Sequence, residues 1–397
     1  YQAPSNARFW RQHALSVLKA QLQTHFGSIL VFLPGTGDIR YLAEQLQPVM
    51  PDNMLLCPLY GELSLSQQQQ AIAPTPHGQY KLVLATNIAE TSLTIEGINL
   101  VVDSGLENVA IYDQQTLNNK LTQRSIAKAS AIQRAGRAGR LQAGHCLRLF
   151  SKDDFERRSE QSNSEIQQAD LLPMLMEVAR WGANACAQLP MIELPNAKSE
   201  QLAWQELTEL GLVSAQHQLT AQGKQVAIFP CHPRFAKMLL SAGQFEQTQQ
   251  VPHLLSLACI FAALLEERDI FSAEQRANNC DITQRVMQLL QHVNKPQHQR
   301  IIQQAQRLFR LATQQADSTG LGFCRIGAQL PLQCSGLLLL LAYPERFAKQ
   351  RDHQGNYLTA YGKGVVMNEN DALADKAYLV AVQFFQRQHS LVIGLAA

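Results

Sequence analysis

Short apolar runs alternate with helix-forming segments through the first 150 residues, and this alternation restricts the possible folds more than any other feature. The runs are SILVFL, LLCPL, KLVLA, LVVD and HCLRLF, at 28–33, 55–59, 81–85, 100–103 and 145–150. Segments 38–47 and 64–73 between them have the spacing of amphipathic helices. Strands that alternate with helices form a parallel sheet covered on both faces. The sequence therefore predicts an α/β domain.

The remaining sequence predicts further regions, and the expected domains are 1–155, 156–222, 223–319 and 320–397. Within the first domain, a polar turn flanked by VAIYD and KLTQRSI predicts an inserted β-hairpin at about 106–126. Helix, helix, short hairpin is the order in the second domain, which is typical of a winged helix. The third is strongly helical. The fourth has mixed character, with a hairpin expected at 357–366.

Composition excludes several classes of protein. A net charge of +2 over 397 residues indicates no general preference for anionic partners. The eight cysteines form no C-x-x-C pair or zinc spacing, so we expect no metal site and a reduced, cytoplasmic setting. The longest apolar runs are shorter than the roughly 20 residues of a membrane span. The chain opens YQAPSNARFW, without an initiator Met or a signal-peptide pattern, so neither secretion nor membrane insertion is expected.

Two local features bear on ligands. Residues 114–152 carry eight Lys or Arg and no Asp or Glu. Such a stretch attracts phosphate, although a solvated basic face is an equal alternative. Phe384, Phe385 and Trp181 have rings that could stack on bases, but each lies in an apolar helical pattern and is expected in the core.

The segment QRAGRAGR at 133–140 is the strongest motif. A helix over 129–140 would place Gln133, Arg137 and Arg140 on one face. The interleaved glycines allow close approach of another backbone. Arginine forms paired, charge-assisted bonds to phosphate and can act as an arginine finger on a γ-phosphate. The alternative, an arginine-rich surface helix, accounts less well for Gln133 and the glycines.

This segment resembles motif VI of superfamily 2 helicases in its DEAH-box form. TNIAETSLTI at 86–95 resembles motif V, and SILVFLPGTGDIR resembles motif IV. Downstream segments are similar to the family's winged-helix and helical ratchet domains, and the region from about residue 320 is similar to the bacterial HrpB-like subgroup. The resemblance implies that the chain is the C-terminal portion of such a helicase, from the second RecA-like domain onward.

The resemblance also implies roles for individual residues. Gln133, Arg137 and Arg140 would face the ATP phosphates, with Arg140 as the finger. Residues implied near the nucleotide are Ser92, Thr94, Glu96 and Ile72, and residues implied at the nucleic acid are Thr86, Asn87 and Gly35. Two positions depart from the family: Glu96 replaces the usual Asp, and Ile72 replaces an aromatic residue that stacks on adenine. An isoleucine has no π-face, so base selectivity should be weak.

The sequence contains no G-x-x-x-x-G-K-[ST] phosphate loop and no DEAH tetrad. Those groups bind the phosphates and organise Mg²⁺. The resemblance therefore implies that ATP and Mg²⁺ are bound mainly by a first RecA-like domain, which would be a partner of this chain, and that the chain alone is inactive.

Three hypotheses for function stay open. The first is an ATP-driven translocase or helicase acting on single-stranded RNA. The second is an RNA-binding adaptor without ATPase activity, which would have no need for Gln133, Arg137 and Arg140 on one face. The third is a DNA helicase of the same superfamily. The form of the motifs favours RNA, but no residue that reads a 2′-hydroxyl can be named.

Overall fold

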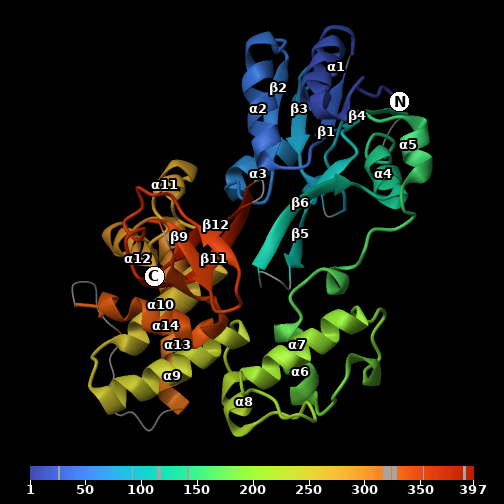
Figure 1. Cartoon of the computed structure of the whole chain (residues 1–397). Coiled ribbons are helices and arrows are strands. Elements are labelled where there is room, and N and C mark those ends of the chain that lie inside the picture. Colours follow the sequence, from blue (N-terminus) through green and yellow to red (C-terminus); the bar gives the residue numbers. More distant parts are fainter. Residues whose placement is uncertain are drawn as a thin grey trace. The chain divides into compact units, whose positions relative to one another are not determined.

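The computed structural model describes residues 1–25, 27–91, 93–113, 118–140, 143–315, 323, 329–351, 353–387 and 390–397. The chain forms two compact units. The first comprises Tyr1–Ile111 and Asn119–Gln168, and the second comprises Tyr112–Asn118 and Ala169–Ala397. Figure 1 shows the elements of both. No helix in the described part of the chain is long and apolar enough to cross a membrane.

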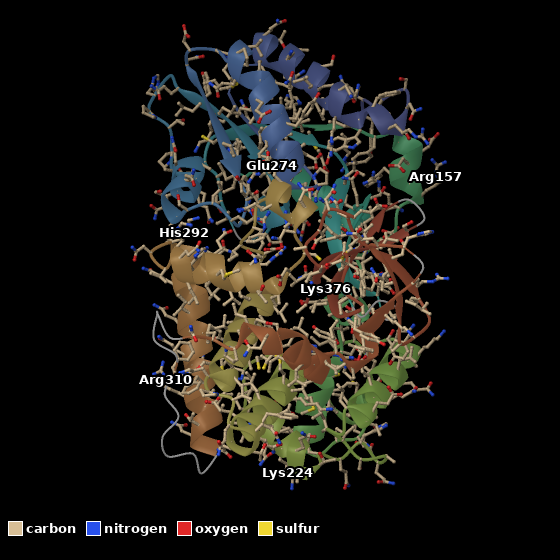
Figure 2. All side chains as sticks on the ribbon, turned by 60° about the vertical axis from the view of Figure 1, so that its left-hand side comes forward. Arg157, Lys224, Glu274, His292, Arg310 and Lys376 are labelled. Atoms are coloured by element: carbon tan, nitrogen blue, oxygen red, sulfur yellow. The ribbon has the colours of Figure 1, made fainter. Side chains whose placement is uncertain are left out.

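A parallel five-stranded sheet forms the centre of the first unit, as the alternation predicts. Its order is β2-β3-β1-β4-β7. The strands are β1 (Ser28–Phe32), β2 (Met54–Leu59), β3 (Tyr80–Ala85), β4 (Ile98–Asp103) and β7 (His145–Arg148). The helices are α1 (Trp10–Thr24), α2 (Thr36–Leu46), α3 (Leu65–Ile72), α4 (Lys128–Ala135) and α5 (Lys152–Arg157). The exposed Arg157 that ends α5 is labelled in Figure 2.

Alternate residues of β1 are buried on opposite faces of this sheet. Ile29 and Val31 pack with residues of α1 and α2 in one core cluster. Leu30 and Phe32 belong to a second cluster, which includes Ala71 of α3 and Ala138. Side chains alternate across a strand, so a strand buried on both faces is apolar throughout. This double burial explains why SILVF is a continuous apolar run.

A separate antiparallel pair, β5 (Leu106–Asp113) and β6 (Asn118–Ser125), lies where the sequence predicts a hairpin. One helix differs from the prediction. The expected helix over 129–140 ends at Ala135, and Arg137 and Ala138 instead donate amide hydrogen bonds three residues back, to Arg134 and Ala135. Glycines at 136 and 139 disfavour continuation of the helix. The inference that Arg137 and Arg140 share a helix face with Gln133 is therefore wrong.

The second unit begins with helices. They are α6 (Leu172–Trp181), α7 (Ala197–Glu209), α8 (Ala221–Val226), α9 (Pro233–Gln249), α10 (Leu254–Glu266), α11 (Ala273–Asn278), α12 (Ile282–Gln291), α13 (Pro296–Gln315) and α14 (Ser335–Ala342). An antiparallel bridge joins Val213 to Leu219 between α7 and α8. Residues Leu254 to Leu264 of α10 are buried all round, and α10 packs against α9 and α13. Trp181, expected in the core, is 80% exposed at the end of α6.

A closed barrel of five strands ends the chain. The strands are β8 (Phe347–Gln350), β9 (Asn356–Thr359), β10 (Gly364–Val366), β11 (Tyr378–Arg387) and β12 (Ser390–Ala396), in the order β10-β12-β11-β8-β9. The hairpin expected at 357–366 is β9 with β10, with Tyr357 opposite Val365. Phe384 and Phe385 lie in β11, so their assignment to a helix is wrong, and Phe385 is 51% exposed.

Candidate functional site

Loops at the carboxyl edge of the parallel sheet carry most of the candidate residues. Gly35 follows β1, and Thr86 and Asn87 follow its neighbour β3. The amide of Leu33 donates to the carbonyl of Ala85 at 2.8 Å, and this bond joins the carboxyl ends of β1 and β3. Asn87 is exposed, and Gly35 and Thr86 are partly exposed. In open α/β sheets this edge is where ligands bind, because the loops of adjacent parallel strands converge there.

The loop at 86–95 begins with a short 3-10 turn, Asn87–Ala89, and then runs past Glu90 toward Thr94. Ala89 is buried against the sheet and Ile95 is buried at the far end, so the loop is anchored at both ends. Thr94 between them is exposed. Ser92 lies outside the described residues.

Arg137 holds this loop from the other side. Its side chain is 8% exposed, and its guanidinium donates to the carbonyl of Leu93 at 2.7 Å and to the carbonyl of Glu90. Burial, together with the charge of Arg140, lowers the pKa of Arg137 from its ordinary value. The side chain therefore joins the arginine segment (residues 133–140) to the loop through main-chain acceptors.

Arg140 has a different environment. It is exposed, and its Nη1 donates to the Thr94 hydroxyl at 2.6 Å. Four further guanidinium donors of such a side chain remain available to a ligand. An exposed arginine beside a hydroxyl, at the end of a buried anchor, is suited to bind an anion such as a phosphate.

Arg134 lies within this network, and the sequence reasoning did not single it out. It is 1% exposed and lies between two carboxylates, with Nε 2.9 Å from Glu90 and Nη1 3.0 Å from Asp103. These charges outweigh the effect of burial, so the pKa of Arg134 is raised. A signal was present in the sequence: an acid in the 86–95 loop and an acid ending LVVD both need a buried partner.

The other residues implied near the nucleotide lie apart from this network. Gln133 is exposed on α4, and Glu96 is exposed just after the 86–95 loop. Ile72 is the last residue of α3 and is partly buried. Among the described residues, no hydrogen bond connects any of these three to Arg137 or Arg140. Their roles stay predictions.

The basic stretch at 114–152 presents less free charge than its composition indicates. Arg124 pairs with Glu107 at 2.9 Å, and Lys128 pairs with Glu160 at 2.7 Å. Arg134 is buried between its carboxylates, and Arg148 donates to the Tyr1 hydroxyl. Several of these positive charges thus serve the fold, while Lys120, Arg140 and Lys152 are exposed.

No group of three or more His, Cys, Asp or Glu side chains in the described part of the chain is arranged to hold a metal ion. The described donors at the sheet edge are guanidinium, hydroxyl and amide groups. These groups fit the phosphates of a nucleotide, and they leave the cation to be held by other groups.

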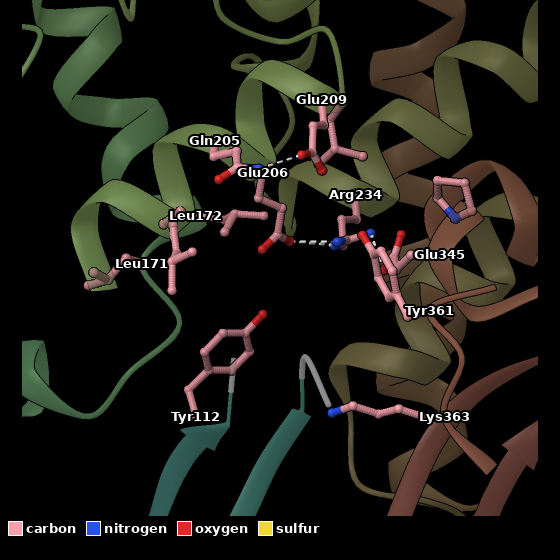
Figure 3. A pocket seen from close by; sticks show the side chains of 14 residues that line it. Tyr112, Leu171, Leu172, Gln205, Glu206, Glu209, Arg234, Glu345, Tyr361 and Lys363 are labelled. Carbon is pink, nitrogen blue, oxygen red and sulfur yellow. Dashed lines mark hydrogen bonds and ion pairs between the residues drawn. The ribbon is translucent and has the colours of Figure 1, made fainter. Parts of the chain in front are cut away.

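The second unit contains a cavity of about 640 Å³, shown in Figure 3. Its lining residues are Tyr112, Leu171, Leu172, Leu202, Ala203, Gln205, Glu206, Glu209, Leu210, Arg234, Pro344, Glu345, Tyr361 and Lys363. Arg234 is 3% exposed and lies 2.6 Å from Glu206 and 2.9 Å from Glu345. These two ion pairs join α7, α9 and the turn after α14, so one cation lies between two carboxylates in the wall of the cavity.

Comparisons with known proteins identify relatives of this chain. The family model "Helicase conserved C-terminal domain" matches residues 12–142. The "ATP-dependent RNA helicase HrpB" of Escherichia coli is 38% identical over 384 residues, which is 96% of this chain and 43% of that protein. The "ATP-dependent RNA helicase HrpA" of Escherichia coli is 36% identical over 225 residues, 55% of this chain and 17% of that protein.

A solved structure matches as well. The crystal structure of the E. coli DExH-box NTPase HrpB covers 100% of this chain with a TM-score of 0.81 and 36% sequence identity, and 45% of that chain is covered. The chain therefore spans less than half the length of these relatives.

Proposed function

The chain belongs to the DEAH-box helicases and corresponds to the C-terminal portion of an HrpB-like member, and from this premise we propose that it supplies half of a composite ATPase site and part of a channel for single-stranded RNA. The junction of the arginine segment with the 86–95 loop is the observation that supports this most. Arg137 bonds the carbonyl of Leu93, and Arg140 bonds the hydroxyl of the next residue, Thr94.

In this proposal Arg140 is the arginine finger, because it is exposed and held by a side-chain bond that a phosphate can replace. Arg137 keeps the loop and the finger in register, and Gln133 approaches the phosphates from α4. Ser92, Thr94, Glu96 and Ile72 are proposed around the nucleotide. Hydrolysis chemistry comes from ATP and Mg²⁺, bound mainly by a first RecA-like domain.

The nucleic-acid side of the proposal uses the sheet edge. Gly35, Thr86 and Asn87 would contact the backbone of the strand, since amide and hydroxyl donors bind phosphate without reading sequence. Residues 156–222 and 223–319 are proposed as winged-helix and ratchet domains that border the channel. The terminal five-stranded barrel is proposed as a further surface for the strand, since five-stranded barrels of the OB class bind oligonucleotides.

A direct test measures steady-state ATP hydrolysis by the complete helicase with and without single-stranded RNA. RNA-stimulated turnover supports the proposal. Strand binding without turnover would favour the adaptor, which would use the same sheet edge without the chemistry. Parallel titrations with RNA and DNA of one sequence separate the third possibility, since equal stimulation by DNA would remove the assignment to RNA.

A further inference from the structure

We propose that Arg134 is a positioning residue that couples the nucleotide-facing arginine segment to the nucleic-acid-facing edge of the sheet. The inference rests on the proposed function, because it assigns a ligand to each end of the connection. Arg134 itself is 1% exposed and touches no ligand under this proposal. Its effect would pass through the groups it holds.

The guanidinium is bonded on several sides. Besides its two carboxylate partners, Arg134 Nη1 donates to the carbonyl of Leu106 at 3.2 Å. Its charge also lies over the ring of Phe32, 4.9 Å from the centroid. Segments from four parts of the sequence thus meet at one cation: β1, the 86–95 loop, the end of β4 with the start of β5, and α4.

One set of contacts leads toward the nucleotide side. Arg134 bonds the carboxylate of Glu90, while the carbonyl of that same residue accepts a bond from Arg137. The carbonyl of Arg134 accepts the amide of Arg137 at 3.1 Å. A displacement of Arg137 would therefore act on Arg134 through both its main chain and its ion pair.

A second set of contacts connects Arg134 to the segments proposed to bind nucleic acid. Asp103 Oδ1 accepts from Arg134 and also from the amide of Gly105 at 2.8 Å. Leu106, whose carbonyl Arg134 holds, is the first residue of β5. Two residues later, Asn108 lies so close to Gly35 that a Cβ on that glycine would be 2.5 Å from its Nδ2. The start of the β5–β6 hairpin therefore connects Arg134 to the loop at Gly35, which is proposed to contact RNA.

One carboxylate oxygen of Asp103 has an unusual environment. The residue is fully buried, yet its Oδ2 has no hydrogen-bond partner among the described residues. Buried carboxylate oxygens are rarely left without a partner, because desolvation is costly. In this proposal, a second arrangement of the network gives Oδ2 a hydrogen-bond partner. Two arrangements of similar energy are what a coupling element requires.

The test uses Asp103→Asn in the complete helicase. The substitution keeps the shape of the side chain and removes one of the two negative charges that hold Arg134. The expected result is a roughly tenfold fall in the ratio of RNA-saturated to RNA-free ATPase rate, as found for residues along coupling networks. The RNA-free rate and the KM for ATP should stay within about twofold, since no ligand contact is removed. A purely structural role would lower both rates together.

The matched control is Asp269→Asn in the second unit. Asp269 pairs with buried Arg285 at 3.0 Å, the same distance as in the Arg134 pair. This variant should lose stability but keep the RNA-dependent ratio. An equal fall in the ratio for both variants, or an unchanged ratio for Asp103→Asn, would overturn the inference.

Hydrogen exchange on the 397-residue chain separates this inference from the proposed function. Asp103→Asn should speed amide exchange both at 136–140 and at 106–111, while Asp269→Asn should change neither. If the wild-type helicase shows no RNA stimulation, the proposed function fails, and exchange alone then decides whether the two segments are coupled. Faster exchange confined to residues beside 103 would contradict the coupling.

Discussion

The Arg140 guanidinium donates a 2.6 Å hydrogen bond to the Thr94 hydroxyl, across 46 residues of sequence. The neighbouring Arg137 is buried and bonded to main-chain carbonyls. Two arginines three positions apart in one motif therefore have different tasks. Arg137 fixes the position of the segment, and Arg140 remains accessible to a ligand.

Arg140→Ala in the complete helicase should lower kcat for ATP by about 10³–10⁵-fold, the range typical of arginine fingers. RNA affinity without nucleotide should hardly change, because the side chain is proposed to face the nucleotide. Arg140→Lys should restore little, since an ammonium cannot reproduce the planar fork. Steady-state ATPase beside RNA titration checks this. The exposed Arg157→Ala is the control, and loss of RNA binding with normal kcat in Arg140→Ala would reassign the residue to the nucleic acid.

The 397-residue chain by itself should fold but show no RNA-stimulated ATPase. Each unit has its own buried core, whereas the sequence has no phosphate loop. Adding a first RecA-like domain in trans is expected to restore turnover. Circular dichroism with a phosphate-release assay makes the measurement. Turnover by the pure chain would show that its own residues complete the site.

Binding of single-stranded RNA should weaken as salt rises, with log K falling by roughly 0.7 per neutralised phosphate per log unit of salt. Asn87→Ala and Thr86→Val should lower affinity by similar factors for different base sequences, because both residues are proposed at the backbone. Fluorescence anisotropy with homopolymers checks this. A sequence-dependent loss would instead mean that these side chains read bases.

Arg134→Met should destabilise the first unit by about 3–5 kcal/mol, because it leaves two carboxylates buried without their cation. The control is Arg124→Met, whose partner Glu107 and own side chain are 13% and 27% exposed. An ion pair in partial contact with water contributes at most about 1 kcal/mol. Urea unfolding of both variants measures the loss in free energy of unfolding. Equal losses would mean that the buried ion pairs of Arg134 contribute no more to stability than the partly exposed pair of Arg124.

Lys81 leads to a prediction about pH. It is 1% exposed, and its ammonium donates to the carbonyls of Ala71 and Ala73 at the end of α3. Burial lowers its pKa below 10.5, against smaller opposing effects of Cys57 and Glu96. The unfolded chain therefore holds this proton more tightly than the folded chain does.

The free energy of unfolding should consequently rise with pH once the pH exceeds the pKa of Lys81 in the folded chain. The rise should end near 10.5, the pKa of this group in the unfolded chain. Wild type should gain free energy of unfolding relative to Lys81→Met over that interval. Urea unfolding at several pH values from about 8 upward measures the difference. Lys19→Met, at an exposed position on α1, serves as the matched variant. A difference that falls with pH would contradict the assigned direction.

The sequence by itself determined the parallel sheet and the places of its loops. The strands β1, β3 and β4 of the parallel sheet are apolar runs that are buried almost throughout, and this signal is local. The order of the motifs then places Gly35, Thr86 and Asn87 after strands of one sheet. The 106–126 hairpin and the 357–366 hairpin were equally local, because each joins segments close in sequence.

Only the tertiary structure decided which charges are free and which strands close the barrel. Arg134 meets Glu90 and Asp103 at separations of 44 and 31 residues, so no pattern in one segment identifies it as a buried ion-pair centre. β12 pairs with β10 and β11 around the barrel, and an amphipathic run such as YLVAVQFF fits a helix as well as a strand until those partners exist. Ion pairing and barrel closure depend on which distant segments the fold brings together, and that depends on the packing of the whole unit.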